Sequence, residues 1–342
     1  MPRPEILPTH TPALFQRAVI RAVEVLQSGR TVALPSETVY GLAANAFSPE
    51  AVEGIYRAKG RPANNPLIVH VATATMAREC ASAWPPLAER LAGRFWPGPL
   101  TLVVPRSSTI PDLVCARGPT VGLRWPSHPL FQAVIRQCGF PLAAPSANPS
   151  DQLSPTTAEH VVAGLGDRVP LVVDAGPCAV GIESTVVDVT GPRPRILRPG
   201  VISSDQVAEA AGIPCIPAGD PGAGPLRSPG QLHRHYSPRA RLVVCSWRDD
   251  RELSARLARE SVPSEQIHLL AHSRIPDETV PAQVSFIPDD PEAFARALYG
   301  YLHQCDDRGA RLIVVESPPP GAAWDGVRDR LLRASAPSDP HP

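Results

Sequence analysis

A stretch rich in proline and glycine, Pro214 to Pro238, limits the fold of this 342-residue chain more than any other feature. It holds six prolines and four glycines, which neither a helix nor a central β-strand can accommodate. Apolar patterns typical of folded domains lie on both sides of it. We therefore predict a first domain over residues 1–213, a linker or lid over residues 214–240, and a second domain over residues 241–342.

The first part alternates helical and strand patterns at the spacing of an α/β domain. One helix is predicted to begin after Thr11 and end at Gly29, and another to begin after Ser48 and end at Gly60. Strands are predicted over residues 31–35, 67–72, 100–104, 120–124, 142–144, 171–174, 185–189 and 195–198. We expect these strands to form one large twisted sheet of mixed direction.

The second part contains four short apolar runs separated by helical patterns. The predicted strands cover residues 241–245, 267–271, 284–287 and 312–316, and the predicted helices include residues 291–305 and 324–334. This alternation is typical of a smaller, Rossmann-like α/β domain. Since no G-x-G-x-x-G occurs in it, the sequence gives no indication of dinucleotide binding.

Charge and cysteine content argue against several classes of protein. The 33 basic and 33 acidic residues balance, so no overall field attracts nucleic acid or an anionic membrane. No apolar run approaches the ~18 residues of a membrane span, and no signal peptide is recognisable, so we expect a soluble cytoplasmic protein without membrane contact. The seven cysteines are scattered without a C-x-x-C pair, which favours reduced, mostly buried thiols.

Lys59 is the only lysine of the chain, and it lies two residues before Arg61. All other basic residues are arginine, whose planar group cannot replace a compact ammonium, so the one remaining lysine is of interest. Two neighbouring cations suit phosphate oxygens. The alternative is that Lys59 only interacts with the dipole of its own helix. Both interpretations stay open at this point.

Polar residues follow two of the predicted strands. Residues 36–42 place hydroxyls and a carboxylate after a buried strand, where open α/β sheets hold ligands. His70 alternates with the apolar residues of its strand, so we expect its side chain on the opposite face of the sheet from Val69 and Val71. A single strand histidine is more often structural than a ligand-binding residue.

Further polar segments lie later in the first part. Residues 145–148 follow another apolar strand, and Ser154 is predicted to cap a helix, whose N-terminus would also suit a phosphate. Arg124 and Arg198, at the ends of predicted strands, are expected to be solvated surface charges when each is considered alone. The linker ends in His233-Arg234-His235-Tyr236, an unusual cluster for a passive spacer.

Together these segments resemble the YrdC-like family of threonylcarbamoyladenylate synthases in its long, two-domain form. The resemblance follows family order through PSETVYGLAANA, AKGRPANNPLIVHV, FWPGPLTLVV, GLRWPSHP, PLAAPSANPS, SPTTAEHV, GIESTVVD and ILRPG. It continues through SPGQLHRHYSP and DGVRDRLLRAS, so it spans nearly the whole chain. The implied fold is a YrdC-like twisted mixed sheet followed by a Rossmann-like domain.

The resemblance implies a nucleotidyltransferase that joins L-threonine, bicarbonate and ATP into threonylcarbamoyl-AMP and pyrophosphate, for threonylcarbamoyladenosine modification of tRNA. Magnesium is expected with the ATP, although the sequence identifies no metal ligands. The expected catalytic residues are Lys59, Arg61, Ser146 and Asn148. The expected ATP contacts are Arg61, Asn65, Thr120, Ser146, Ser154, Arg198 and His235. The expected L-threonine contacts are Thr38, His70, Arg124, Ala144 and Ser184.

Two other functions share parts of this resemblance. The first domain of the family also suggests a module that binds double-stranded RNA or the ribosome, but balanced charge argues against RNA as the main ligand. Carbamoyltransferases share the first domain and carry additional large domains that this chain lacks. A downstream tRNA threonylcarbamoyltransferase and weak RNA binding remain open as partners.

Overall fold

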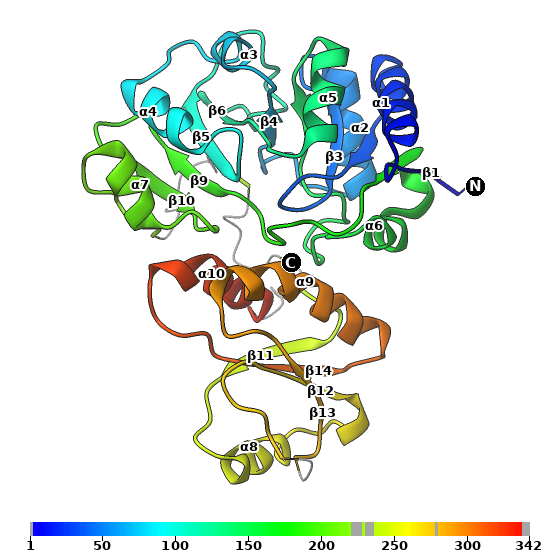
Figure 1. Cartoon of the computed structure of the whole chain (residues 1–342), viewed down its shortest axis with the longest axis vertical. Helices are drawn as coiled ribbons and strands as arrows, with labels where there is room; N and C mark the ends of the chain where they lie inside the picture. The colour runs from blue at the N-terminus through cyan, green and yellow to red at the C-terminus, as the bar shows by residue number, and fades with distance from the viewer. Residues whose placement is uncertain (1–2, 220–227, 230–235, 278–279, 337–342) are drawn as a thin grey trace. The chain divides into compact units, whose positions relative to one another are not determined.

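The computed structural model describes residues 3–219, 228–229, 236–277 and 280–336 (Figure 1). The chain divides into two compact units. The first comprises residues 1–150 and 154–231, and the second comprises residues 151–153 and 232–342. Among the described residues, no helix has both the length and the apolar character that a membrane crossing requires.

A ten-stranded mixed sheet forms the centre of the first unit, in the order β1-β8-β2-β3-β7-β4-β6-β5-β9-β10. The sheet contains parallel pairs, such as β4 with β6, and antiparallel pairs, such as β2 with β3. The strands are β1 (Glu5–Pro8), β2 (Val32–Leu34), β3 (Gly41–Asn45), β4 (Ile68–His70), β5 (Leu100–Pro105), β6 (Thr120–Arg124), β7 (Leu142–Ala143), β8 (Leu171–Asp174), β9 (Thr185–Asp188) and β10 (Arg195–Arg198).

Helices pack on both faces of this sheet and bury two apolar cores (Figure 1). One core includes α1 (Pro12–Gln27) and α5 (Pro129–Cys138). The other includes residues of α2 (Pro49–Lys59), α3 (Ala74–Glu79), α4 (Pro86–Phe95), α6 (Ala158–Leu165) and α7 (Ser204–Ala211). A 3₁₀ turn, η1 (Gly166–Arg168), follows α6.

The ends of α2 follow from local sequence. The Ser48 hydroxyl accepts a hydrogen bond from the amide of Ala51, which satisfies one free donor of the first turn. Pro49 occupies the first helical position, where its missing N–H costs nothing. Gly60 ends the helix with a φ of 62°, a left-handed conformation that favours glycine. This ending fixes the direction in which Lys59 leaves the helix.

The second unit contains a four-stranded, all-parallel sheet in the order β11-β14-β12-β13. In Figure 1, α9 and α10 lie on one face of this sheet and α8 lies on the other. The elements are β11 (Arg241–Cys245), α8 (Asp250–Leu257), η2 (Ser264–Gln266), β12 (Ile267–Ala271), β13 (Gln283–Phe286), α9 (Pro291–Asp307), β14 (Leu312–Glu316), η3 (Ala322–Trp324) and α10 (Asp325–Ala334).

The mixed sheet and the parallel second sheet confirm the predicted fold class. The sequence prediction missed β1 and β3. Strand β3 is Gly41-Leu-Ala-Ala-Asn45, a run of small residues that is buried at almost every position and shows no alternation. It packs closely, because a Cβ on Gly41 would lie 3.3 Å from the Cβ of Ala144.

One predicted cap is wrong. Ser154 does not begin a helix, since α6 begins at Ala158 and Thr157 is its N-cap, with its hydroxyl accepting from the amide of His160. The cysteine prediction is confirmed, because all seven thiols are free and six of them are buried. Most of the predicted linker, residues 220–227 and 230–235, lies outside the described residues.

Candidate functional site

Lys59 connects the end of α2 to the loop that follows β7. Its Nζ donates to the carbonyl oxygens of Ser146 at 2.6 Å and of Asn148 at 2.5 Å, and it lies 3.3 Å from Asn148 Oδ1. The amide of Ser150 donates back to the Lys59 carbonyl at 2.9 Å. Lys59 is 3% exposed. Lys59 therefore does more than interact with the dipole of its own helix, because its contacts hold residues 146–148 against α2.

Arg61 lies in the turn after α2 and folds back onto the chain before β4. Its Nε donates to the Asn65 carbonyl at 3.0 Å, and its Nη2 donates to Asn65 Oδ1 at 2.6 Å and to the Pro66 carbonyl at 2.8 Å. The parallel register pairs Ile68, the first residue of β4, with Gly122, two residues after Thr120 begins β6. Arg61 and Asn65 therefore precede β4 on the side where β6 begins.

His70 and Arg124 are the last residues of the same two strands and face each other in register. Arg124 Nη1 donates to Thr38 Oγ1 at 2.9 Å, and its Nη2 lies 2.8 Å from Glu37 Oε1. The His70 ring packs on Phe131 at 5.0 Å between centroids. Since β6 rises about 3.3 Å per residue, this group lies roughly 13 Å from Thr120. The predicted site thus has two ends along β4 and β6.

The side chain of His70 lies on the face that was predicted. Phe131 belongs to the core that contains α1 and α5, whereas Val69 and Val71 belong to the opposite core. Burial and the nearby Arg124 cation lower the pKa of His70 to about 3. The imidazole is therefore neutral near pH 7, so that its Nδ1 or Nε2 can accept a hydrogen bond.

A third group of polar contacts surrounds Ser184, directly before β9. Arg198 Nε and Nη2 donate to the Ser184 carbonyl at 3.2 and 2.9 Å, and Nη2 also donates to Ser184 Oγ at 3.1 Å. Ser184 Oγ lies 2.8 Å from Thr101 Oγ1. Ser154 Oγ donates to a carboxylate oxygen of Glu183. The loop at residues 183–184 thereby joins Arg198 to Ser154.

Main-chain hydrogen bonds bring the loops of these groups together. The amide of Leu42 donates to the Pro145 carbonyl at 2.8 Å, and the amide of Ala147 donates to the Tyr40 carbonyl at 2.8 Å. The amide of Ala144 donates to the Ile68 carbonyl at 3.0 Å, beside β4. Ala144 and Ser146 therefore lie between β3 and β4, next to the loop that contains Thr38.

The expectation of solvated arginines is wrong. Arg124 and Arg198 are 4% and 3% exposed, because carbonyl and hydroxyl oxygens from separate loops accept from their N–H groups and the Glu37 carboxylate pairs with Arg124. His235 lies outside the described residues, as do His233 and Arg234. Every other predicted site residue is described, and each lies in one of the groups above.

Sequence reasoning missed three residues of this arrangement: Glu37, Thr101 and Glu183. Both carboxylates directly precede a predicted site residue, Thr38 or Ser184, and each lies in a short polar segment next to a buried strand. That position was a usable signal. Thr101 lies inside an apolar strand, so the sequence gave no signal for it.

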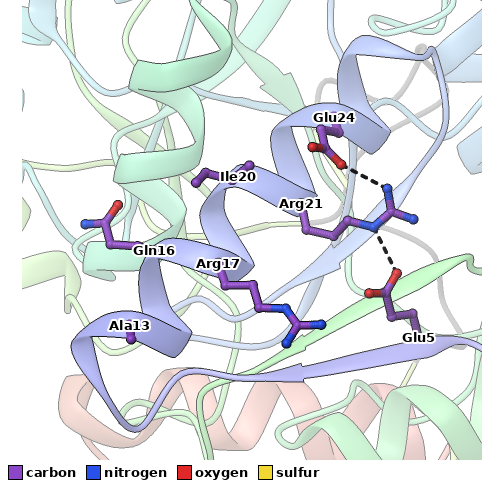
Figure 2. Close-up of a pocket in the computed structure, with 7 residues that line it drawn as sticks. All are labelled: Glu5, Ala13, Gln16, Arg17, Ile20, Arg21 and Glu24. Carbon is purple, nitrogen blue, oxygen red and sulfur yellow. Dashed lines mark hydrogen bonds and ion pairs between the residues drawn. The ribbon is translucent and has the colours of Figure 1, made fainter.

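A shallow hollow on the outer side of α1 is separate from this site. Figure 2 shows that Arg17, Arg21 and Glu24 of α1 and Glu5 of β1 surround it. Arg21 pairs with Glu5 at 2.9 Å and with Glu24 at 3.0 Å, and these side chains are about half exposed. No predicted site residue lines this hollow.

Two family models match the chain in sequence order. A model described as "Telomere recombination", which groups Sua5, YciO and YrdC, matches residues 24–200. A model described as "Threonylcarbamoyl-AMP synthase, C-terminal domain" matches residues 202–336. The two models together cover both described units.

Similar proteins match over almost the full length. The threonylcarbamoyl-AMP synthase of Bacillus subtilis is 36% identical over 340 residues, which cover 96% of this chain and 94% of the relative. The synthase of Pyrococcus abyssi is 35% identical over 319 residues, or 92% and 93% of the two chains. The structure of P. abyssi Sua5 complexed with L-threonine matches with a TM-score of 0.87, 34% identity and 97% coverage of both chains.

The depressed pKa of His70 makes a testable prediction about acid stability. The unfolded chain takes up a proton near pH 6.5 at this residue, whereas the folded protein does so only near pH 3, so stability falls as pH falls below 6.5. Between pH 6.5 and 5 the native protein should lose about 1–2 kcal/mol more stability than His70→Gln. Urea unfolding at both pH values measures this difference. The exposed His10→Gln should behave like the native protein, and equal acid losses in all three proteins would contradict the prediction.

Proposed function

Because the chain belongs to the family of two-domain threonylcarbamoyl-AMP synthases, we propose that it converts L-threonine, bicarbonate and ATP into threonylcarbamoyl-AMP and pyrophosphate. The similarity over both units, at 35–36% identity to proteins with this name, carries the assignment. The product supplies the threonylcarbamoyl group for tRNA modification. We further propose that a separate tRNA threonylcarbamoyltransferase uses this product.

The reaction we propose has two balanced steps. The ammonium of threonine and bicarbonate give a carbamate, one water and one proton, which leaves to solvent. A carbamate oxygen then attacks the α-phosphorus of ATP and displaces pyrophosphate. Negative charge grows on the phosphate oxygens during this displacement, so positioned cations stabilise the transition state. Lys59 and Arg61, both less than a tenth exposed, suit this role.

The two ends of the site suggest an orientation for the substrates. We assign the end that begins β4 and β6, with Arg61, Asn65 and Thr120, to ATP, together with Ser146, Ser154, Arg198 and His235. We assign the opposite end, with His70 and Arg124, to L-threonine, together with Thr38, Ala144 and Ser184. Lys59 and Asn148 hold the loop between the two ends, where the carbamate and the α-phosphate would meet. Positioning of these two reactants supplies much of the expected acceleration.

We propose that magnesium enters with ATP rather than occupying a site of its own. The described residues contain no group of three or more histidine, cysteine, aspartate or glutamate side chains that could hold a metal ion. Magnesium is commonly bound through substrate phosphates and few protein ligands. The chain's own cations would then act beside the metal, and we assign no step to it.

We also propose that the linker acts as a lid. Its last part is anchored within the second unit: Tyr236 is 1% exposed, and its ring lies 5.1 Å from the guanidinium carbon of Arg330 and 6.0 Å from the ring of Tyr299. The amide of Ser237 donates to the Asp151 carbonyl at 2.9 Å. Asp151 lies between Asn148 and Ser154 in the sequence. A lid would exclude water, which hydrolyses carbamates and mixed anhydrides.

The proposed reaction requires both small substrates. Purified protein with ATP and magnesium should release pyrophosphate only when L-threonine and bicarbonate are both present, because the carbamate is the nucleophile. A coupled pyrophosphate assay with each substrate left out in turn measures this requirement. Release at the same rate without threonine would exclude the proposed function.

Lys59→Met should lower turnover about a hundredfold or more, the scale for loss of a charge contact in the transition state. Arg57→Met is a matched control, because Arg57 is an exposed cation in the same last helical turn. It should keep nearly native turnover. Steady-state assays of both variants, with thermal melts to verify folding, make the comparison. If Lys59→Met were as active as Arg57→Met, Lys59 would have only a structural role.

Replacement of His235 and Tyr236 together by alanine should reduce threonine-dependent pyrophosphate release about a hundredfold, a typical effect of mispositioned reactants. Tyr236→Phe keeps the ring against Arg330 and should retain most of the activity. A chain ending near Ile213 should fold on the core of the first unit and be as impaired as the double variant. Full activity in that folded truncation would show that the linker is a tether and would remove His235 from the site.

A further inference from the structure

Several buried polar atoms near the end of β6 lack a hydrogen bond of good geometry with any described residue. They are both carboxylate oxygens of Glu37, Nη2 of Arg124, Nδ1 of His70 and Nδ1 of His128. Glu37, Arg124 and His70 are each more than nine-tenths buried. Two of these atoms, Glu37 Oε1 and Arg124 Nη2, face each other as an ion pair. Most buried polar groups in native proteins have a partner, so the remaining atoms, Glu37 Oε2 and the two ring nitrogens, indicate the position of a polar ligand.

Glu37 and Arg124 form the charged centre of this group of atoms. Glu37 Oε1 lies 2.8 Å from Arg124 Nη2, and both side chains are less than a tenth exposed. Thr38 Oγ1 accepts from Nη1 at 2.9 Å, and the Gly98 carbonyl accepts from Nε at 3.4 Å. The guanidinium is therefore held in one orientation from three directions. Oε2 of Glu37 has no cation beside it and no hydrogen bond of good geometry among the described residues, although the backbone amides of Ser127 and Glu37 lie near the carboxylate.

The charges at this end of the site cancel. Burial raises the pKa of Glu37, but Arg124 and the nearby backbone amides of Ser127 and Glu37 lower it more, so Glu37 is ionised at neutral pH. Burial and Arg124 keep His70 neutral, and burial also lowers the pKa of His128, although Glu37 opposes this shift. One carboxylate and one guanidinium remain, with a net charge of zero.

A neutral pair of opposite charges matches an amino acid better than it matches an anion. An α-amino acid at neutral pH carries one carboxylate and one ammonium group, so each of its charges can face an opposite charge. An anion without the ammonium would pair with Arg124 but leave Glu37 facing an uncharged group. Buried charge without a partner is costly, and the cost provides discrimination.

We propose that Glu37 is a substrate-binding residue that makes the site select a zwitterion. This role rests on the proposed function. Arg124 pairs with the carboxylate of threonine, and Glu37 Oε2 accepts a hydrogen bond from its ammonium group. Glu37 is a binding group and not the base of the reaction, because Arg124 lowers its pKa and so makes it a weak base. The proton of the ammonium group leaves to solvent when the carbamate forms.

A purely structural role for Glu37 makes a different prediction. If Glu37 only neutralised Arg124, its loss would disturb the site for every ligand that contacts Arg124. If Glu37 binds the ammonium group, its loss weakens only ligands that carry one. The two roles are separated by L-threonine and its α-hydroxy analogue, in which a hydroxyl replaces the ammonium group and the net charge is negative.

Isothermal titration calorimetry of the full chain with each ligand tests the proposal. The native protein should bind L-threonine at least tenfold more tightly than the α-hydroxy analogue, the scale of one charge-assisted hydrogen bond. Glu37→Gln keeps the shape but gives the pocket a net positive charge. It should bind threonine at least tenfold more weakly and the analogue as tightly as the native protein or more so. Glu37→Asp, which keeps the charge, should retain the preference for threonine.

The controls separate this proposal from the proposed function. Glu5→Gln removes a carboxylate that pairs with Arg21 on the outer face of the first unit (Figure 2), and it should bind both ligands like the native protein. Failure of the native protein to bind threonine would overturn the proposed function itself. Equal affinity of the native protein for both ligands would overturn only the role of Glu37, and so would parallel weakening of both ligands in Glu37→Gln.

Discussion

Four buried cations bound to main-chain carbonyl oxygens hold the loops of the proposed site in place. Lys59 binds the loop after β7, Arg61 the turn before β4, Arg124 the Gly98 carbonyl, and Arg198 the loop before β9. Hydrogen bonds from a charged donor are stronger than neutral ones, and burial strengthens them further. Each cation therefore fixes a separate loop from which proposed phosphate or carboxylate contacts project.

Much of the fold could be predicted because its signals are local. The caps at Thr11, Ser48 and Gly60 depend on residues within one turn, and the apolar runs of β11, β12 and β14 match the structure residue for residue. Strand β3 could not be recognised, since its small residues are buried on both faces and lack the alternation of an exposed strand. Its place in the sheet depends on β2 and β7, which lie far apart in the sequence.

The burial of the arginines depends on contacts that no local pattern reveals. Arg124 is satisfied by Thr38 and Gly98, which lie 86 and 26 residues away in the sequence. Ser154 was mistaken for a cap for the same reason, because its real partner is Glu183, 29 residues further along. The family resemblance named most of the polar residues, but it did not identify the carboxylates between them. The roles of Glu37 and Glu183 depend on the cation and the hydroxyl that they face, which lie far from them in the sequence.

Residues 151–153 group with the second unit, although the residues on both sides of them in the chain belong to the first. Asp151 and Tyr236 both have positive φ angles, 66° and 61°, a conformation that costs non-glycine residues of order 1 kcal/mol or more. Surrounding contacts must offset this cost, and the Ser237 amide on the Asp151 carbonyl and the Arg330 cation on the Tyr236 ring are two of them. Within the first unit, Lys59 binds the loop at Asn148 and Glu183 binds it at Ser154. Both ends of this loop are therefore fixed by buried side chains that lie far from it in the sequence, which no local sequence pattern could have indicated.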